Sequence, residues 1–316
     1  MSDKKIISVV GATGAQGGGL VRAIMNDKDG PFTARALTRD VNSDKAKSLA
    51  ALGAEVVEAD LHDPQSLNRA FTGAHGAYCV TFFWEHFSPD KEGTHASAMA
   101  QAAKETGLAH VIWSTFEDTR KLVPLDDDRM PTLMEKYKVP HFDSKGQVDH
   151  VFTDRGVPTT FLLTSFYWDN LIHFGMGPKP GPDGKLAFTL PMDDKKLPGI
   201  AAEDIGKCAY GIFLKGDELV KKTIGVSGEQ LTGAQMADAL TKALGREVQY
   251  NAIPPDVYRG LGFPGAADLG NMFQYKRDFQ EEFCGPRDPE MARSLNPSLQ
   301  NFEEWLSKNK ERIPLE

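Results

Sequence analysis

The stretch HFDSKGQVDHVF, residues 141–152, gathers side chains that can move protons. His141 stands four residues ahead of Lys145, and Ser114 ends the β-branched run that comes before this stretch. An imidazole transfers protons near neutral pH, an ammonium group can donate one, and a hydroxyl can hydrogen-bond a substrate carbonyl. His141, Lys145 and Ser114 are therefore the candidate catalytic residues. A satisfied polar side chain is the plainer alternative for the histidine.

The tyrosine–lysine pair that short-chain dehydrogenases use for proton transfer is missing. In those enzymes a tyrosine transfers the proton, and a lysine four residues later lowers its pKa. The chain has seven tyrosines, and no lysine stands four residues after any of them. The sequence therefore lacks the usual proton donor of these enzymes.

Lys145 would point inward from an expected helix. It lies three and seven residues before Val148 and Phe152, so a helix over residues 143–153 would present all three on one face. A buried lysine needs a polar partner, and the ribose of a nicotinamide nucleotide would be one. A solvated lysine is the alternative. A capping residue at the start of this helix would leave His141 outside it.

Near the amino terminus, VVGATGAQGGG spans residues 9–19. Gly11, Gly14 and Gly17 form a Gly-x-x-Gly-x-x-Gly turn between an expected strand and an amphipathic helix. There the backbone can approach a pyrophosphate without side-chain clashes, and the helix amides face the phosphates. Because the turn opens a series of alternating strands and helices, it predicts a dinucleotide site. A tight turn without a ligand is the alternative.

Two later segments indicate which dinucleotide. ALTRD ends the second expected strand with Arg39, at the position where an arginine pairs with the 2′-phosphate of NADP. EADLHD follows the third strand and offers Asp60 and Leu61 to the adenine. We therefore expect NADP(H). Arg39 could instead be a solvated surface cation, and Asp60 could cap the next helix.

The segment CVTFFWEHF, residues 79–87, stands at the carboxyl end of the fourth expected strand. Ligands of open α/β sheets bind in the crevice outside these strand ends. Thr81, Phe82 and Phe83 are therefore expected to border the cofactor. A neighbouring cleft would be bordered by the remaining large side chains, Trp84, His86 and Phe87. Core packing is the rival explanation.

Short β-branched runs alternate with helical stretches along the first half of the chain. The expected strands are residues 6–10, 33–38, 55–58, 77–81, 110–114 and 159–163. The expected helices are residues 17–25, 45–52, 64–71, 88–106 and 143–153. Strands separated by helices of this length are joined by crossovers. The predicted fold class is α/β, a Rossmann-type doubly wound parallel sheet.

The organisation changes beyond residue 165. A loop rich in glycine and proline leaves the core, and the amphipathic stretch 199–214 is expected to return to it. TIGVSG, residues 223–228, indicates a strand, and Thr232 to Gln235 a capping box. The predicted domains are a Rossmann domain of residues 1–165 plus about 199–215, and a smaller, mostly helical α/β domain of about 166–198 plus 216–316.

Composition limits the class of protein. With 316 residues, 41% hydrophobic and 25% charged, the chain is ordinary for a globular protein, and no apolar stretch approaches the roughly 20 residues that a bilayer requires. A net charge of −8 disfavours direct binding to nucleic acid. The three cysteines and scattered histidines lack ligand spacing, so no metal is expected. We expect a cytoplasmic protein. Entry into the nucleus and a homodimeric state are both compatible with the sequence.

The chain resembles the NmrA-like family of atypical short-chain dehydrogenases. The likeness rests on GATGAQGG, HFDSKG, YWDN at 167–170 and LGFPGAADLGNMF at 261–273, covers nearly the whole chain, and is closest to the animal NADPH-sensor member. The resemblance implies a protein that binds NADP(H) and regulates partners. It also implies cofactor contacts at Gly11, Thr13, Gly14, Ala15, Gln16, Gly17, Arg39, Asp60, Thr81, Phe82, Phe83, Lys145 and the stretch from Tyr167 to Asn170.

Two features depart from the sensor member. Thr94 stands where the sensor has a lysine, which would weaken a phosphate contact. Residues 121–140 are longer than in the sensor, and this acidic, proline-bearing insert could be a lid over the cleft or a partner surface.

A cofactor site without the usual proton donor favours the first of three functions, and whether the protein is an enzyme stays open. The first is an NADP(H) sensor whose occupancy sets its affinity for a regulatory protein partner. The second is an NADPH-dependent reductase of a small aromatic or carbonyl compound. It would use Lys145, assisted by Ser114 or His141, as the resemblance to isoflavone-reductase-like relatives implies. The third is a scaffold with a vestigial cofactor site, which predicts no nucleotide binding.

Overall fold

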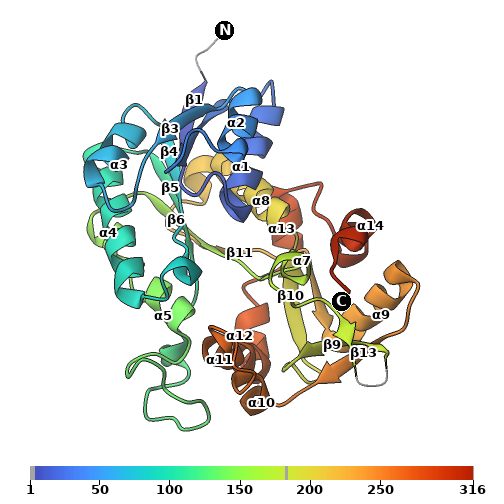
Figure 1. The fold of residues 1–316 in the computed structure, drawn as a ribbon. Helices are drawn as coiled ribbons and strands as arrows, with labels where there is room; N and C mark the ends of the chain where they lie inside the picture. Colours follow the sequence, from blue (N-terminus) through green and yellow to red (C-terminus); the bar gives the residue numbers. More distant parts are fainter. Residues whose placement is uncertain (1–3, 182–183, 316) are drawn as a thin grey trace.

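Seven strands form one parallel sheet in the amino-terminal part of the molecule (Figure 1). The computed structural model describes residues 4–181 and 184–315. The strands are β1 (Lys5–Val9), β2 (Phe32–Thr38), β3 (Glu55–Glu58), β4 (Gly76–Cys79), β5 (His110–Thr115), β6 (Thr159–Leu163) and β11 (Thr223–Gly225). Their order is β11-β6-β5-β4-β1-β2-β3, and every neighbouring pair is parallel. The predicted Rossmann-type sheet is confirmed.

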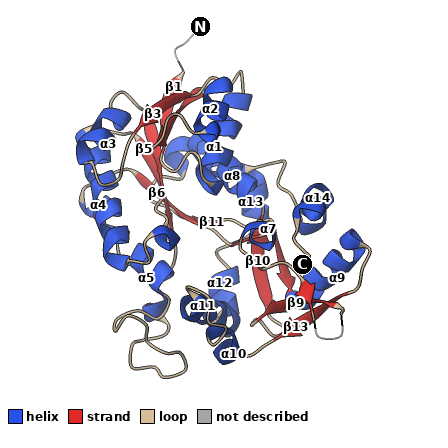
Figure 2. Cartoon of the chain, viewed as in Figure 1, coloured by secondary structure: helices blue, strands red, loops and turns tan. Residues whose placement is uncertain are grey.

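Helices cover both faces of this sheet, as Figure 2 shows. One side carries α1 (Ala15–Asn26), α2 (Asp44–Ala51), α8 (Ala202–Lys215) and α13 (Pro289–Leu295). The other carries α3 (Pro64–Phe71) and α4 (Pro89–Glu105). Val9 packs in one core with Leu20 of α1, whereas Val10 packs in another with Leu67 of α3. This alternation follows from the two-residue period of a strand.

The order of strands reverses beside β1, and this reversal determines where a ligand can bind. From β1 the chain moves outward to β2 and β3, and then crosses back to β4 on the other side of β1. Neighbouring loops therefore diverge at the carboxyl ends of β1 and β4 and leave a crevice. The glycine turn follows β1, and the aromatic segment 79–87 follows β4.

The expected helix over residues 143–153 is wrong in its extent. The structure has two short helices there, α5 (Pro140–Gly146) and α6 (His150–Asp154). A Cβ on Gly146 would stand 2.5 Å from the backbone nitrogen of Asp118, so the end of α5 lies against another segment. Because α5 begins at Pro140, His141 lies inside the helix rather than before it.

The carboxyl-terminal half adds two small sheets and further helices. One sheet has the order β12-β10-β7 and the other β13-β9-β8, and helices make up more of this part than its strands do. The strands are β7 (Phe166–Tyr167), β8 (Lys179–Pro180), β9 (Leu186–Leu190), β10 (Lys196–Ile200), β12 (Glu229–Thr232) and β13 (Val248–Ala252). The helices are α7 (Asn170–His173), α9 (Gly233–Leu244), α10 (Pro255–Arg259), α11 (Ala266–Asp278), α12 (Gln280–Cys284) and α14 (Phe302–Asn309).

Segments of this half also join the large sheet. Helix α8 packs closely on α1, where a Cβ on Gly206 would stand 2.1 Å from the backbone nitrogen of Leu20. Strand β11 pairs with β6, although we expected residues 216–316 to belong to the smaller domain, so that assignment is wrong for β11. The remaining domain boundaries stay a prediction. In the described part of the chain, no helix is long and apolar enough to cross a membrane.

Candidate functional site

One large cavity, of about 1670 Å³, is lined by the residues predicted for cofactor binding or catalysis, except Trp168 and Asp169 of the stretch from Tyr167 to Asn170. Its wall comes from the carboxyl ends of β1, β2 and β4, from α5, and from β7, α10 and α11 of the other half. The predicted residues that line it are Gly11, Thr13, Gly14, Ala15, Gln16, Gly17, Arg39, Asp60, Leu61, Thr81, Phe82, Phe83, Ser114, His141, Lys145, Tyr167 and Asn170. Their individual roles stay predictions.

The glycine turn has the geometry of an anion site. Gly11 has a φ of +66°, which favours glycine, and its carbonyl accepts the N–H of Gly14 at 2.9 Å. A Cβ on Gly17 would stand 2.4 Å from that carbonyl oxygen, so only glycine fits there. Helix α1 starts at Ala15, and no side chain of the described residues caps it. Its first amides are therefore left for a ligand.

At the far end of this region, Arg39 is exposed and held by a carboxylate. Its side chain is 63% exposed, and Nη1 lies 2.6 Å from Oε1 of Glu85, which raises the pKa of Arg39. Asp60 does not cap the next helix, because Asp63 is the N-cap of α3. The Asp60 carboxylate accepts the N–H of His62 at 2.8 Å instead.

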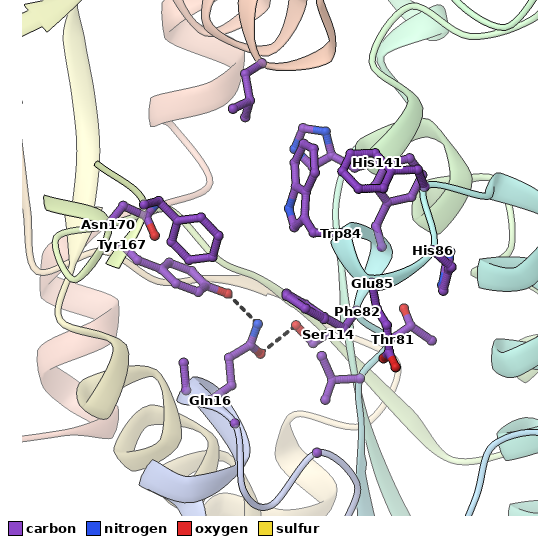
Figure 3. Close-up of a pocket in the computed structure, with 18 of the residues that line it drawn as sticks. Gln16, Thr81, Phe82, Trp84, Glu85, His86, Ser114, His141, Tyr167 and Asn170 are labelled. Atoms are coloured by element: carbon purple, nitrogen blue, oxygen red, sulfur yellow. Dashed lines mark hydrogen bonds between the residues drawn. The ribbon is translucent and has the colours of Figure 1, made fainter. Parts of the chain in front are cut away.

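A hydrogen-bonded cluster surrounds Gln16 (Figure 3). The hydroxyl of Ser114 donates to Oε1 of Gln16 at 2.8 Å, and the Tyr78 hydroxyl donates to the same oxygen. The amide nitrogen of Gln16 donates to the hydroxyl of Tyr167. Burial raises the pKa of both tyrosines. Neither tyrosine therefore resembles the acidified tyrosine of a short-chain dehydrogenase.

Lys145 is buried and fully paired. Its ammonium donates to the carbonyl oxygen of Thr81 at 3.2 Å and to the hydroxyl of the same residue, and lies 3.0 Å from Oε2 of Glu92. An ammonium group has three protons, and these three oxygens can accept all of them. As arranged here, Lys145 holds the end of β4 in place, and it would have to break a contact to protonate a ligand.

Glu92 continues this network to a histidine. The imidazole Nδ1 of His86 accepts the N–H of Ser88 at 3.0 Å, so the neutral ring carries its proton on Nε2, 3.2 Å from Oε1 of Glu92. Burial lowers the pKa of His86 and keeps the ring neutral at pH 7. Glu92 therefore supports Lys145 directly, whereas Oε1 of Glu92 and Nε2 of His86 have no hydrogen-bond partner among the described residues. Sequence reasoning did not single out Glu92, since one acidic residue on a helix gives no signal.

His141 forms a dyad with Asp268. Its Nδ1 lies 2.6 Å from Oδ1 of Asp268, and its backbone N–H donates to Oδ2 at 3.2 Å. Trp84 lies beside the ring, with 4.7 Å between ring centroids, as Figure 3 shows. With Nδ1 engaged by the carboxylate, Nε2 is the ring nitrogen left for a further contact. Sequence reasoning missed Asp268, although it belongs to the LGFPGAADLGNMF motif.

The aromatic side chains of residues 82–87 divide between the core and the rim. Phe83 is buried, while Phe82 is 55% exposed and Phe87 is also exposed, yet all three line the cavity. Core packing therefore applies to Phe83, and a position at the border of the cavity applies to Phe82 and Phe87. Three further exposed apolar side chains line the same cavity, Phe174, Leu261 and Phe263. Such a rim suits a ligand with a large apolar surface.

The two features in which this sequence departs from the NADPH-sensor member lie away from this cavity. Thr94 is exposed on α4 and donates its hydroxyl to the carbonyl of Asp90 at 2.9 Å. No residue of 121–140 is among the described residues that line the cavity, so the insert is not a lid over it. The amide of Asn271 donates to the carbonyl of Lys138 at 2.6 Å and ties the insert to α11. A partner surface there stays a prediction.

Comparisons with known proteins all find similarity to NmrA-like proteins. A model of the NmrA-like family matches residues 3–306. The NmrA-like family domain-containing oxidoreductase malD of Malbranchea aurantiaca is 29% identical over 262 residues, which are 78% of this chain and 75% of malD. A crystal structure of NmrA, described as a negative transcriptional regulator, has a TM-score of 0.79 at 25% identity and covers 97% of this chain and 95% of its own. NmrA in complex with NAD has a TM-score of 0.78 at 25% identity, over 96% of this chain and 95% of that one.

Proposed function

This chain belongs to the NmrA-like family, and we propose that it binds NADP(H) and uses it to reduce a small aromatic or carbonyl compound. The relative malD is named an oxidoreductase, and NmrA has been crystallised with NAD. The large cavity supports the proposal, because it offers room for a second ligand beside a dinucleotide. A special closeness to the animal NADPH sensor stays a prediction.

The residues present fit a dinucleotide phosphate. The uncapped start of α1 and the glycine turn would hold the pyrophosphate, and Gly17 leaves the space that a Cβ would fill. Arg39 would pair with a 2′-phosphate, and this side chain is the reason to prefer NADP(H) over NAD(H). Bound NADPH would supply a hydride to the substrate.

The observation that carries the reductase proposal is the His141–Asp268 dyad in the wall of that cavity. A carbonyl that accepts a hydride needs a proton on its oxygen, and a protonated His141 can donate it from Nε2. Asp268 would orient the ring and stabilise its charge, as carboxylates do for catalytic histidines. Lys145 would position Thr81 and the bound nucleotide rather than donate the proton, because its three protons are already bonded.

The test is to follow the oxidation of NADPH with a panel of quinones, enones and aldehydes. We expect turnover with at least one member. His141→Asn should lower kcat by about 100-fold, the usual size of a lost general acid, while the Kd for NADPH is unchanged. Asp268→Asn should lower kcat less, and Thr94→Ala, outside the cavity, should match the unmodified protein. Tight NADPH binding without any oxidation would contradict the reductase.

A second candidate is the NADP(H)-dependent regulator, and the Arg39–Glu85 pair favours it. Glu85 belongs to the same segment as Phe82 and Trp84, so a 2′-phosphate that takes Arg39 from Glu85 would free part of the cavity rim. We expect NADP⁺ to change the fluorescence of Trp84 more than NAD⁺ does, with Trp84→Phe as the control. Equal changes with both nucleotides would contradict this route.

A further inference from the structure

Lys276 is a buried cation for which the proposed function has no use. It lies on α11, is only 3% exposed, and lines the cavity. Within the described part of the chain, its ammonium has neither a hydrogen bond nor an ion pair, and its neighbours are three aromatic rings. The distances from Nζ to the ring centroids are 4.9 Å for Phe283, 5.5 Å for Phe142 and 5.6 Å for Phe273. Cation–π contacts offset only part of the cost of burying a charge.

The helix connects Lys276 to the candidate catalytic dyad. Asp268, Met272 and Lys276 are spaced four residues apart, so they share one face of α11, and the first and last lie about 12 Å apart along the helix axis. Met272 also lines the cavity. A ligand of two or three fused rings could therefore reach Lys276 from the region of His141.

Aromatic rings form the wall on the way to Lys276. Phe116 and Phe142 stack with 4.0 Å between centroids, and Phe116 also lies 6.1 Å from the ring of His141. Ser165 adds a second polar group, because its hydroxyl is buried, lines the cavity and has no partner among the described residues. An unpaired ammonium beside aromatic rings, with an unpaired hydroxyl in the wall of the same cavity, is complementary to a planar ligand with an anionic group.

We propose that Lys276 and Ser165 form a subsite that binds a carboxylate or phenolate carried by an aromatic ligand. The inference rests on the proposed function, since the ligand would be the substrate of the same cavity. The anion would pair with the ammonium and accept from the Ser165 hydroxyl. The rings of Phe116 and Phe142 would pack on the aromatic part.

Protonation of Lys276 should control this subsite. Burial and, to a smaller extent, Arg287 lower the pKa of Lys276 to about 7, against the opposite effect of Glu117 and Cys284. Arg287 and Glu117 are paired with each other, with Nη2 and Oε2 at 2.9 Å, so neither replaces a ligand for Lys276. The ammonium is present below pH 7 and is lost as the pH rises above it. Between pH 6.5 and 8.5 the affinity for an anion should fall about 25-fold, in proportion to the charged fraction.

The experiment compares 2-naphthoate with its neutral analogue 2-naphthamide by isothermal titration, with and without NADP⁺. We expect naphthoate to bind at least tenfold more tightly at pH 6.5 and to lose affinity toward pH 8.5, while naphthamide does not change. Lys276→Met should remove the difference between the probes, and Lys276→Arg should keep it and abolish the pH dependence. Ser165→Ala should weaken the binding of naphthoate a few-fold and leave that of naphthamide unchanged. This second variant tests the subsite if Lys276→Met does not fold.

Equal affinities for the two probes in the unmodified protein would overturn the subsite, as would a preference for naphthoate that survives Lys276→Met. The titration of NADP⁺ keeps the two proposals apart. NADP⁺ binding without naphthoate selectivity would contradict only the subsite. Naphthoate selectivity without NADP⁺ binding would contradict only the proposed function.

Discussion

Single charged side chains around the cavity differ in how they are paired, and this pairing predicts what each can bind. Lys145 has three oxygen partners and little capacity for a fourth. Arg39 has one partner, Glu85, in an exposed pair that contributes at most about 1 kcal/mol. Among the described residues Lys276 has no hydrogen bond or ion pair, and aromatic rings lie around its ammonium. A phosphate can therefore displace Glu85 from Arg39, whereas Lys145 is built into the scaffold.

Removing the charge of Glu85 should therefore strengthen the binding of NADP⁺. Glu85→Gln should tighten it about two- to fivefold, because the phosphate no longer competes with a carboxylate for Arg39. Binding of NAD⁺, which lacks the 2′-phosphate, should not change. Calorimetric titration of both nucleotides measures this, with Asp90→Asn, an exposed carboxylate outside the cavity, as the matched control. An equal gain for both nucleotides would exclude competition at Arg39.

At the scale of elements, hydrophobic periodicity predicted every β-strand and α-helix described before α5 to within two residues of its ends, but not the short 3-10 helices at 83–85 and 119–121. These elements depend on local spacing, which the chain itself carries. The prediction of one helix over 143–153 was wrong, because the chain breaks it after Gly146, whose backbone lies against that of Asp118 in a distant segment. The cavity residues from the glycine turn, β2 and β4 could be predicted, since they follow strand ends. Asp268 and Lys276 could not, because only the packing of α11 brings them there.

The contact between α1 and α8 leaves no room for a side chain. Gly206→Ala should lower the free energy of unfolding by about 3 kcal/mol, because the new Cβ would stand 2.3 Å from the carbonyl carbon of Gly19 and two backbones would have to separate. Urea unfolding measures the change. Gly93→Ala in α4 is the control, since its Cβ would meet only Val148 at 3.5 Å, and it should be neutral or slightly stabilising. Equal midpoint shifts would contradict this packing.

Strand β5 begins with a histidine that must stay neutral. Burial lowers the pKa of His110 to about 4, below its ordinary value of 6.5, so the unfolded chain binds more protons between these two pH values. Stability should therefore fall as the pH drops through this window, by about 2–3 kcal/mol from this group at pH 4.5. His110→Gln should lose that part of the pH dependence. Unfolding of both proteins by urea at pH 7.5 and 4.5 tests it, and identical slopes would contradict the assignment.

The two halves of the molecule meet at the cavity and are tied by long-range contacts. Asp268 binds His141 across 127 positions, and Arg287 donates to the carbonyl of Thr164 at 2.8 Å. Arg287 also pairs with Glu117. A sequence holds no local signal for such pairs, and for this reason the second half of the site escaped prediction. Because of these contacts, a ligand bound at the glycine turn should also stabilise α11.

Hydrogen exchange of the whole chain can test this coupling. NADPH at 100 times its Kd should stabilise the folded protein by about 2.7 kcal/mol. Because α5 and α11 share the His141–Asp268 bond, exchange should slow in α11 as well as at the glycine turn. Asp268→Asn should reduce the protection of α11 and leave that of the glycine turn. Gly17→Ala should abolish both, since its Cβ would collide with the carbonyl of Gly11 and disrupt the turn that holds the phosphates. Protection confined to the large sheet would mean that the two halves respond independently. That result would contradict a regulator in which bound cofactor changes the affinity for a partner through α11.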